Sequence, residues 1–174
     1  IYMSVTGFGN GPIGQSLPGQ DLLLQALTGL ADITGKAQEP PTPAGAAIID
    51  VYGALWMAFG VVSAVLHRER TGEGQLVELN MLQAAMALQI EPLTVHLNGT
   101  PVSRNGDGLA SGYIQAPYGV YRTSDDKYIV LSSTPMNIYY DAIQDERLAP
   151  YVDKAWTDKK VIHDLFVEII ATKT

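Results

Sequence analysis

The sequence contains no cysteine, which excludes disulfide bonds, thiolate nucleophiles and cysteine-ligated zinc from these 174 residues. Its three histidines, His67, His96 and His163, are too scattered to show the spacing of a metal site. We therefore expect no metal ligands here. The lack of cysteine also fits a reducing cytoplasm.

Basic residues and long apolar runs are also scarce. Eleven lysines and arginines stand against 18 acidic residues, which gives a net charge of −7, and no basic run offsets it. This balance disfavours binding to nucleic acid or to an anionic membrane surface. The longest apolar stretch, 51–66, contains glycines and falls short of the ~20 residues of a membrane span. We expect a helix there that is surrounded by protein.

The first residues, Ile1-Tyr2-Met3, show neither an initiator methionine nor the charged start of a signal peptide. We therefore expect the chain to begin part-way through a longer, cytoplasmic protein. Its hydrophobic fraction of 47% and charged fraction of 17% are typical of a folded domain.

Hydrophobic periodicity predicts an α/β chain. Strands are expected at 2–6 and, as a hairpin about the turn 124–127, within 118–133, and 75–79 is a brief alternating stretch. Helices are expected from Asp21 to a stop at Gly35, over 46–71, from the capping box Asn80-x-x-Gln83 to Pro92, and over 159–173. The stretch 98–119, rich in glycine, is the best candidate for a domain boundary.

The pattern Gly9-x-Gly11-x-x-Gly14 matches the glycine spacing of a dinucleotide-binding loop. Such a loop runs directly from a strand into a helix, whose N-terminus holds the pyrophosphate. Here the turn residues Pro18-Gly19 follow, and Pro12 removes one backbone donor. We therefore interpret the segment as a glycine-rich loop over a cleft and assign it no nucleotide.

Asp50 is the only acidic or basic residue between Glu39 and His67, and a long apolar stretch follows it. Two roles fit this position. An aspartate before a helix is most often an N-cap. A carboxylate at a helix N-terminus is also kept ionised by free N–H groups and by the helix dipole, and can then meet a ligand. The two roles do not exclude each other.

Few kinds of catalysis suit such an isolated carboxylate. The sequence offers it no acidic partner for paired acid–base work, no clustered metal ligands and no G-x-S-x-G elbow of a serine hydrolase. Covalent attack on an activated acyl group, which gives a mixed anhydride, remains open to it.

The sequence resembles the class III CoA-transferases, the CaiB/BaiF family, over roughly residues 2–135. The resemblance rests on an ordered set of motifs: GFGNGP at 7–12, PGQD at 18–21, the isolated Asp50, RERTGEGQLV at 68–77 and YGVYRTSDDKYIVL at 118–131. One departure is Asp126, which stands where the family usually has glycine. Family members are also more than twice as long as this chain.

By position, Asp50 matches the family's catalytic aspartate. The resemblance implies that this carboxylate attacks an acyl-CoA thioester and forms an acyl-aspartyl anhydride and free CoA. An acceptor carboxylic acid then exchanges in through an aspartyl-CoA thioester and leaves as the new acyl-CoA. The helix start would offer N–H donors to the thioester oxyanion. The implied partners are acyl-CoA, a carboxylic acid and a second subunit in an interlocked homodimer, with coenzyme A as substrate and no permanently bound cofactor.

Further positions enter through the resemblance. Gly106, Gly108 and Gly112 fall where the family often has a glycine-rich loop near the active site; alternatively, they belong to a plain linker between domains. Gln20 stands where the family's racemases have a histidine, and we include it among the substrate-binding candidates. Because an amide cannot take a proton from an α-carbon, the transferase is favoured over the racemase.

We therefore expect the central part of a Rossmann-like large domain at 1–100, a glycine-rich connector at 101–117 and the start of a small α+β domain at 118–174. The expected function is transfer of CoA between carboxylic acids. An acyl-CoA racemase of the same family is one alternative. A non-catalytic fragment, in which Asp50 only caps its helix, is the other.

Overall fold

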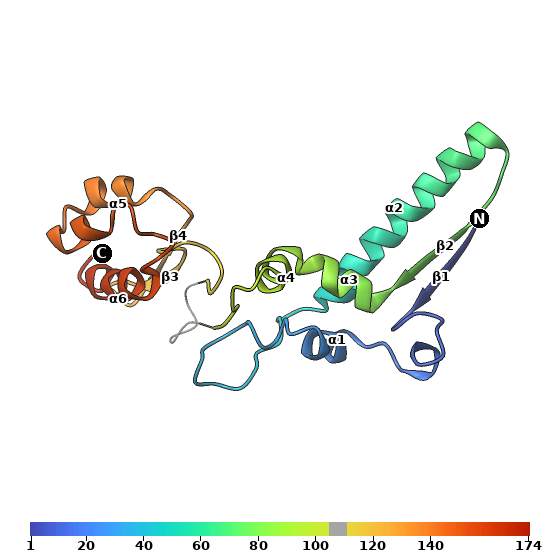
Figure 1. The fold of residues 1–174 in the computed structure, drawn as a ribbon, viewed down its shortest axis with the longest axis horizontal. Coiled ribbons are helices and arrows are strands. Elements are labelled where there is room, and N and C mark those ends of the chain that lie inside the picture. Colours follow the sequence, from blue (N-terminus) through green and yellow to red (C-terminus); the bar gives the residue numbers. More distant parts are fainter. Residues whose placement is uncertain (105–110) are drawn as a thin grey trace. The chain divides into compact units, whose positions relative to one another are not determined.

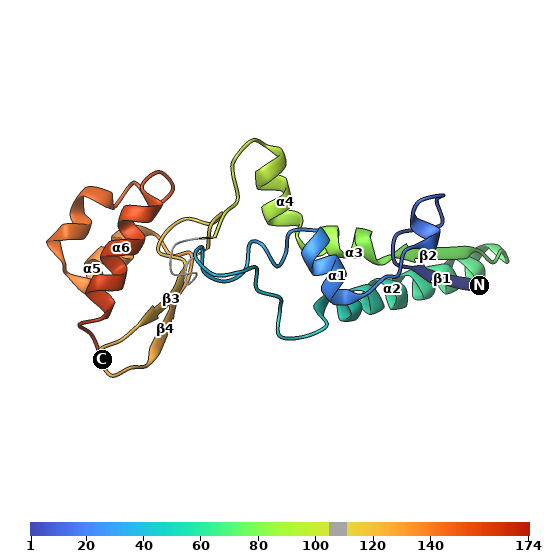
Figure 2. The same cartoon turned by 90° about the horizontal axis from the view of Figure 1, so that it is seen from below.

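A computed structural model describes residues 1–104 and 111–174 as an α/β protein. The chain divides into two compact units. The first comprises Ile1–Thr34 and Pro41–Pro101, and the second comprises Gly35–Pro40 and Val102–Thr174. Figure 1 and Figure 2 show the course of the chain through the helices and strands of both units.

Two parallel strands, β1 (Tyr2–Thr6) and β2 (Leu76–Asn80), form the sheet of the first unit. Between them in the sequence lie two helices, α1 (Asp21–Leu27) and α2 (Ile48–Thr71). Parallel strands need such a crossover because a tight turn cannot join them. In both views α2 runs alongside the strand pair (Figure 1; Figure 2). The predicted strand at 2–6 is confirmed, and the alternating stretch at 75–79 supplies most of β2.

The two faces of the β1–β2 pair differ in chemistry. Val77 and Leu79 point towards α2, where they lie against Gly60 and Gly53. Alternate residues of a strand point to the opposite face. Towards the carboxyl ends of the strands that face is polar and carries Ser4, Thr6, Glu78 and Asn80, while Tyr2 and Leu76 lie at its other end. Helix α2 therefore covers one face of the strand pair, while hydroxyl, amide and carboxylate groups occupy the carboxyl-terminal part of the other.

The packing of α2 on β2 depends on two glycines with different surroundings. A Cβ at Gly60 would lie 2.8 Å from Val77 Cγ1, whereas a Cβ at Gly53 would meet Leu79 at an ordinary 3.6 Å. Alanine favours a helix over glycine by about 1 kcal/mol, so we expect Gly53→Ala to be neutral or stabilising. We expect Gly60→Ala to unfold more easily than Gly53→Ala by about 1–3 kcal/mol, because valine's branched end is stiff. Urea denaturation measures the difference, and equal stabilities would contradict it.

The glycine-rich segment 7–19 closes on itself. The backbones of Gly7 and Gly19 are in contact, and Gly14 approaches the Phe8 carbonyl oxygen so closely that any side chain there would collide. Within the segment, the Gly9-x-Gly11-x-x-Gly14 pattern ends in a three-residue 3-10 helix, η1 (Gly14–Ser16), and the first α-helix begins only at Asp21. The segment therefore has the loop geometry expected from Pro18-Gly19 and lacks the strand-to-helix junction of a dinucleotide-binding loop.

Helix α2 ends where the sequence predicts. Gly72 adopts a left-handed conformation with φ of 79°, and its N–H donates to the Arg68 carbonyl at 2.8 Å.

The expectation that protein surrounds α2 is wrong within this chain. Large apolar side chains recur at helical spacing on its exposed face: Val51, Leu55, Phe59, Val62 and Leu66. Of the residues described, α2 alone forms a helix long and apolar enough to cross a membrane, a test that core helices of soluble proteins also pass.

Two other helices of the first unit end or begin at unexpected residues. Helix α3 (Met81–Leu88) starts at its predicted cap, where the Asn80 side chain accepts from the Gln83 N–H at 2.8 Å. It was expected to reach Pro92, but a new helix, α4 (Ile90–Leu97), begins first. Pro92 lies in the first turn of α4, where its missing N–H costs no helical bond. Helix α1 ends at Leu27 and not near Gly35, because Gly29 is left-handed.

The second unit contains an antiparallel hairpin, β3 (Gly119–Arg122) and β4 (Tyr128–Leu131), followed by α5 (Met136–Ile143), η2 (Glu146–Tyr151) and α6 (Lys159–Ile170). The hairpin and α6 agree with the prediction, whereas α5 and η2 were not expected. In the hairpin turn Asp126 has φ of 61°, which explains why glycine suits this position and why aspartate is tolerated.

Aromatic side chains form the core of the second unit. Tyr121 of β3 and Phe166 of α6 are buried, with ring centroids 6.0 Å apart. His163 of α6 is also buried, and its Nδ1 lies 3.0 Å from the Tyr121 hydroxyl. This histidine is therefore a hydrogen-bonded core residue.

Candidate active site

Asp50 lies in the first turn of α2, with its side chain exposed. Within residues 1–104 and 111–174, its carboxylate has no hydrogen-bond or ion-pair partner. The N-cap position belongs to Ala47. Asp50 is therefore not the N-cap of its helix, and the purely capping interpretation is wrong. The structure leaves this carboxylate accessible to a ligand.

The carboxylate that caps α2 is that of Asp21, the first residue of α1. Its Oδ2 accepts hydrogen bonds from the N–H groups of Ile49 at 2.7 Å and of Asp50 at 3.1 Å. An acceptor for these donors is what a helix N-terminus requires, and a negative charge there is favoured by the helix dipole. A residue 29 positions away in the sequence therefore fixes the backbone of Asp50.

The remaining N–H groups at the start of α2 are engaged as well. The Ile48 N–H donates to the Ala46 carbonyl at 2.8 Å, and the Val51 N–H donates to the Ala47 carbonyl at 3.1 Å. The expectation that this helix start offers free donors to a thioester oxyanion is therefore not met. The physical reason is that Asp21 accepts from two of these N–H groups, the Ala46 carbonyl accepts from a third, and the first helical hydrogen bond engages the Val51 N–H.

Gln25 of α1 extends the contacts of Asp21. Its side-chain amide donates to Asp21 Oδ1, and its Oε1 accepts from the Ala44 N–H at 2.8 Å. Gln25 is only 2% exposed. A buried amide without partners would be costly, so this side chain ties α1 to the segment that leads into α2.

The other residues predicted from the sequence are distributed over both units. Gln20 occupies the N-cap position of α1, is exposed, and directly precedes Asp21. Gly112 belongs to the second unit, where a Cβ would collide with the Ser103 carbonyl oxygen, so glycine is required there on steric grounds. Gly106 and Gly108 lie outside the described residues. Gln20 is thus the sequence neighbour of the residue that caps the helix of Asp50.

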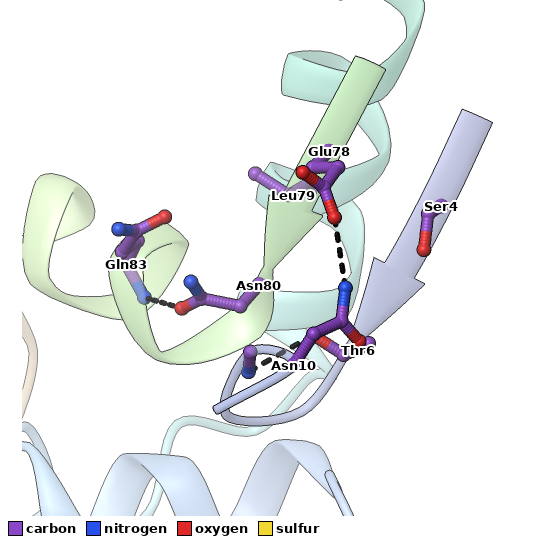
Figure 3. Close-up of a pocket in the computed structure, with 8 residues that line it drawn as sticks. Ser4, Thr6, Asn10, Glu78, Leu79, Asn80 and Gln83 are labelled. Carbon is purple, nitrogen blue, oxygen red and sulfur yellow. Dashed lines mark hydrogen bonds between the residues drawn. The ribbon is translucent and has the colours of Figure 1, made fainter. Parts of the chain in front are cut away.

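A polar pocket of about 300 Å³ lies at the carboxyl ends of β1 and β2 (Figure 3). Asn10 Nδ2 donates to Glu78 Oε1 at 2.8 Å across it, and the side chains of Thr6 and Asn80 line it. Ligands of open α/β sheets commonly bind at this end of the strands. Asp50 is not among the lining residues, so the pocket is separate from the nucleophile candidate.

A second hollow, of about 290 Å³, lies on the exposed face of α2 and is apolar. Its lining consists of Tyr52, Leu55, Trp56 and Phe59. The Trp56 ring meets the Tyr52 and Phe59 rings edge to face, each at 6.2 Å between centroids.

In the part of the chain that the structure describes, no group of three or more histidine or acidic residues could hold a metal ion.

Sequence reasoning missed Asp21 and Gln25. Asp21 stands in the PGQD motif at 18–21, where the sequence pattern indicates only the start of a helix. The four-residue spacing from Asp21 to Gln25 indicates that both side chains lie on one face of that helix. Nothing in the sequence pattern indicates their contacts with Asp50 and Ala44, because these join segments from different parts of the chain.

The chain matches the sequence model of CoA-transferase family III over residues 1–161. Among similar proteins, the succinyl-CoA:mesaconate CoA-transferase of Haloarcula hispanica is 34% identical over 135 residues, which are 75% of this chain and 33% of that protein. The human succinyl-CoA:glutarate CoA-transferase is 31% identical over 134 residues, 76% of this chain and 30% of that protein. The chain therefore spans about a third of the length of the curated relatives it matches.

Solved structures agree with these matches. The crystal structure of Rv3272 from Mycobacterium tuberculosis is similar with a TM-score of 0.78 and 27% identity, over all of this chain and 48% of that one. The crystal structure of a CaiB/BaiF family protein from Brucella suis is similar with a TM-score of 0.68 and 26% identity, over all of this chain and 47% of that one.

Proposed function

The chain belongs to CoA-transferase family III, and from this we propose that the whole protein transfers coenzyme A between an acyl-CoA thioester and a carboxylic acid, with Asp50 as nucleophile. The observation that carries the proposal is the exposed Asp50 carboxylate, which has no partner in the described residues while Asp21 fixes its backbone. The relatives named above as CoA-transferases support the same reaction class.

In the proposed first half-reaction, an Asp50 carboxylate oxygen attacks the thioester carbonyl carbon. The carbon–sulfur bond breaks, and CoA leaves as a thiolate with its electron pair. The product is an anhydride between Asp50 and the donor acyl group. The thiolate then attacks the Asp50 carbonyl carbon, which releases the donor carboxylate and leaves an aspartyl-CoA thioester.

The second half-reaction reverses these steps with another acid. The acceptor carboxylate attacks the aspartyl carbonyl carbon and expels the CoA thiolate, which gives a new anhydride. The thiolate then attacks the acceptor acyl carbon, so the new acyl-CoA leaves and the Asp50 carboxylate is restored. No oxidant, metal or net proton enters the cycle. Asp50 must therefore be ionised at the start of the cycle, and its carboxyl group must be accessible and correctly placed in both half-reactions.

The oxyanion formed in each step needs donors other than the first N–H groups of α2, which are engaged. We propose that the glycine-rich segment containing Gly106, Gly108 and Gly112 supplies them, since glycine lets backbone N–H groups approach an intermediate closely. We retain Gln20 as a substrate-binding candidate because it is exposed and adjacent to Asp21. Replacement of Gly108 by valine without loss of activity would contradict the role of this segment.

We also propose that the whole protein is a cytoplasmic homodimer in which residues 118–174 begin a small domain. The exposed apolar face of α2 supports the proposal that further protein covers this helix, because soluble proteins seldom expose such large apolar patches. Sedimentation of the whole protein as a monomer, or its recovery with membranes, would overturn this assignment.

The proposed reaction is tested by trapping its covalent intermediate. We expect incubation with acyl-CoA and then hydroxylamine to convert Asp50 into its hydroxamate, because hydroxylamine attacks both the anhydride and the thioester. Peptide mass spectrometry locates the product, and a panel of CoA esters and free acids identifies the substrates. A racemase would instead exchange the substrate's α-hydrogen in deuterated water without labelling Asp50. A non-catalytic protein would do neither, and either result would contradict the transferase.

A further inference from the structure

We propose that Asp21 and Gln25 are positioning residues that fix the first turn of α2 and leave the Asp50 carboxylate free to react. The inference rests on the proposed function of Asp50. It assigns a role in that reaction to two side chains of α1 that take part in no chemical step.

Asp21 takes over the capping of α2. One of its oxygens accepts from the N–H groups of both Ile49 and Asp50, at 2.7 and 3.1 Å. Ala47 at the N-cap has no side chain that could do this. Without Asp21, the nearest carboxylate in the same turn would be that of Asp50, and the uncapped N–H groups would attract it. Capping by Asp21 therefore prevents the nucleophile from being drawn to its own helix.

Gln25 holds Asp21 in place. Both polar atoms of its amide group form hydrogen bonds: the nitrogen donates to Asp21 Oδ1, and the oxygen accepts from the Ala44 N–H at 2.8 Å. Ala44 lies shortly before the start of α2, so one buried side chain links α1, the approach to α2 and the capping carboxylate. The neighbouring Ile49 and Leu24 are fully buried in one cluster, which fixes the two helices next to these polar contacts.

The first α2 turn is therefore held by polar contacts on one side and by packing on the other. A nucleophile misplaced by about 1 Å loses about a hundredfold in rate, because reaction requires near-contact geometry. Loss of Asp21 should then lower kcat, while binding of acyl-CoA should change little since neither residue is proposed to contact it. Such a split distinguishes positioning from general destabilisation.

The experiment compares Asp21→Ala, Asp21→Asn and Gln25→Leu in the whole protein with the control Thr28→Val. Thr28 directly follows the last residue of α1. Its hydroxyl donates to the Leu24 carbonyl at 2.7 Å and accepts from the Gln89 side chain at 2.8 Å, and neither partner belongs to α2. The control therefore removes a comparable pair of hydrogen bonds. Measurements are kcat, KM for acyl-CoA, the yield of Asp50 hydroxamate and the melting temperature.

We expect kcat of Asp21→Ala to fall about a hundredfold with KM nearly unchanged, and hydroxamate yield to fall with it. Asp21→Asn should recover part of the rate because its amide oxygen still accepts from the N–H groups of Ile49 and Asp50. This variant tests the inference if Asp21→Ala does not fold. Gln25→Leu should resemble Asp21→Asn, and Thr28→Val should keep the wild-type rate. Equal kcat for Thr28→Val and the Asp21 variants at equal melting temperature would overturn the inference. Absence of the hydroxamate in the wild-type protein would overturn the proposed function first, and the inference with it.

Discussion

The Asp50→Asn variant of the whole protein should lose CoA transfer almost completely. We expect kcat to fall by about 10⁴-fold or more, as when the nucleophile of a covalent mechanism is removed. An amide has no ionised oxygen to attack the thioester, and no anhydride or aspartyl thioester forms from it. The loss corresponds to about 5 kcal/mol of barrier, since each tenfold in rate is about 1.4 kcal/mol. Steady-state assay with mass spectrometry of the Asp50 peptide measures both effects.

The structure predicts that this variant folds normally. The Asp50 side chain is exposed and has no partner in the part of the chain described, so its replacement should change stability by less than about 0.5 kcal/mol. Glu69→Gln is the matched control, because it neutralises an exposed carboxylate near the other end of the same helix. Retention of a tenth or more of the wild-type rate by Asp50→Asn would contradict the nucleophile assignment.

Much of the fold could be predicted because it depends on local patterns. A short, partly β-branched stretch that stops at glycine predicted β1, two segments joined by the turn 124–127 predicted the β3–β4 hairpin, and Gly72 predicted the end of α2. A helix face repeated every three to four residues predicted α6. In each case the residues that decide the element lie within a few positions of one another, so the sequence carries the signal directly.

The errors arise where contacts from elsewhere decide the result. Composition alone indicated a helix buried on all sides, but α2 packs against β2 on one face and exposes Phe59 and its neighbours on the other. Pro92 was read as a helix breaker, although its position in a first turn makes it compatible with α4. No helix was predicted at α5, whose eight residues after Pro135 give only two turns of helical periodicity.

The candidate site shows the same limit. Asp50 could be singled out from the sequence because no other charged residue lies near it. The interpretation of Asp50 as the N-cap of α2 was wrong, since the carboxylate that caps α2 is that of Asp21 in α1. The capping hydrogen bonds join residues 28 and 29 positions apart, and such a separation produces no recognisable spacing pattern in the sequence. The fold therefore assigns the capping role to Asp21 and leaves the Asp50 carboxylate available for the proposed reaction.

The second unit should depend strongly on Phe166. This side chain is fully buried in α6 and contacts the rings of Tyr121 and Tyr139, with centroids 6.0 and 5.5 Å away. We expect Phe166→Ala to lower the free energy of unfolding of this unit by about 3–5 kcal/mol, because burial is lost and a cavity remains. That is a large share of the 5–15 kcal/mol typical of a domain, so the unit should open locally under native conditions.

Hydrogen exchange of the α6 amides is the appropriate measurement, because it reports on this unit and not on the first. Protection should fall by about two to four orders of magnitude, as a loss of 3–5 kcal/mol requires. Trp156→Ala is the control within the same unit: Trp156 is 62% exposed and contacts only Lys159 in the described ring interactions, so its loss should cost less than about 1 kcal/mol. Equal protection in the two variants would show that Phe166 does not anchor the core, since the larger aromatic ring is removed in the control.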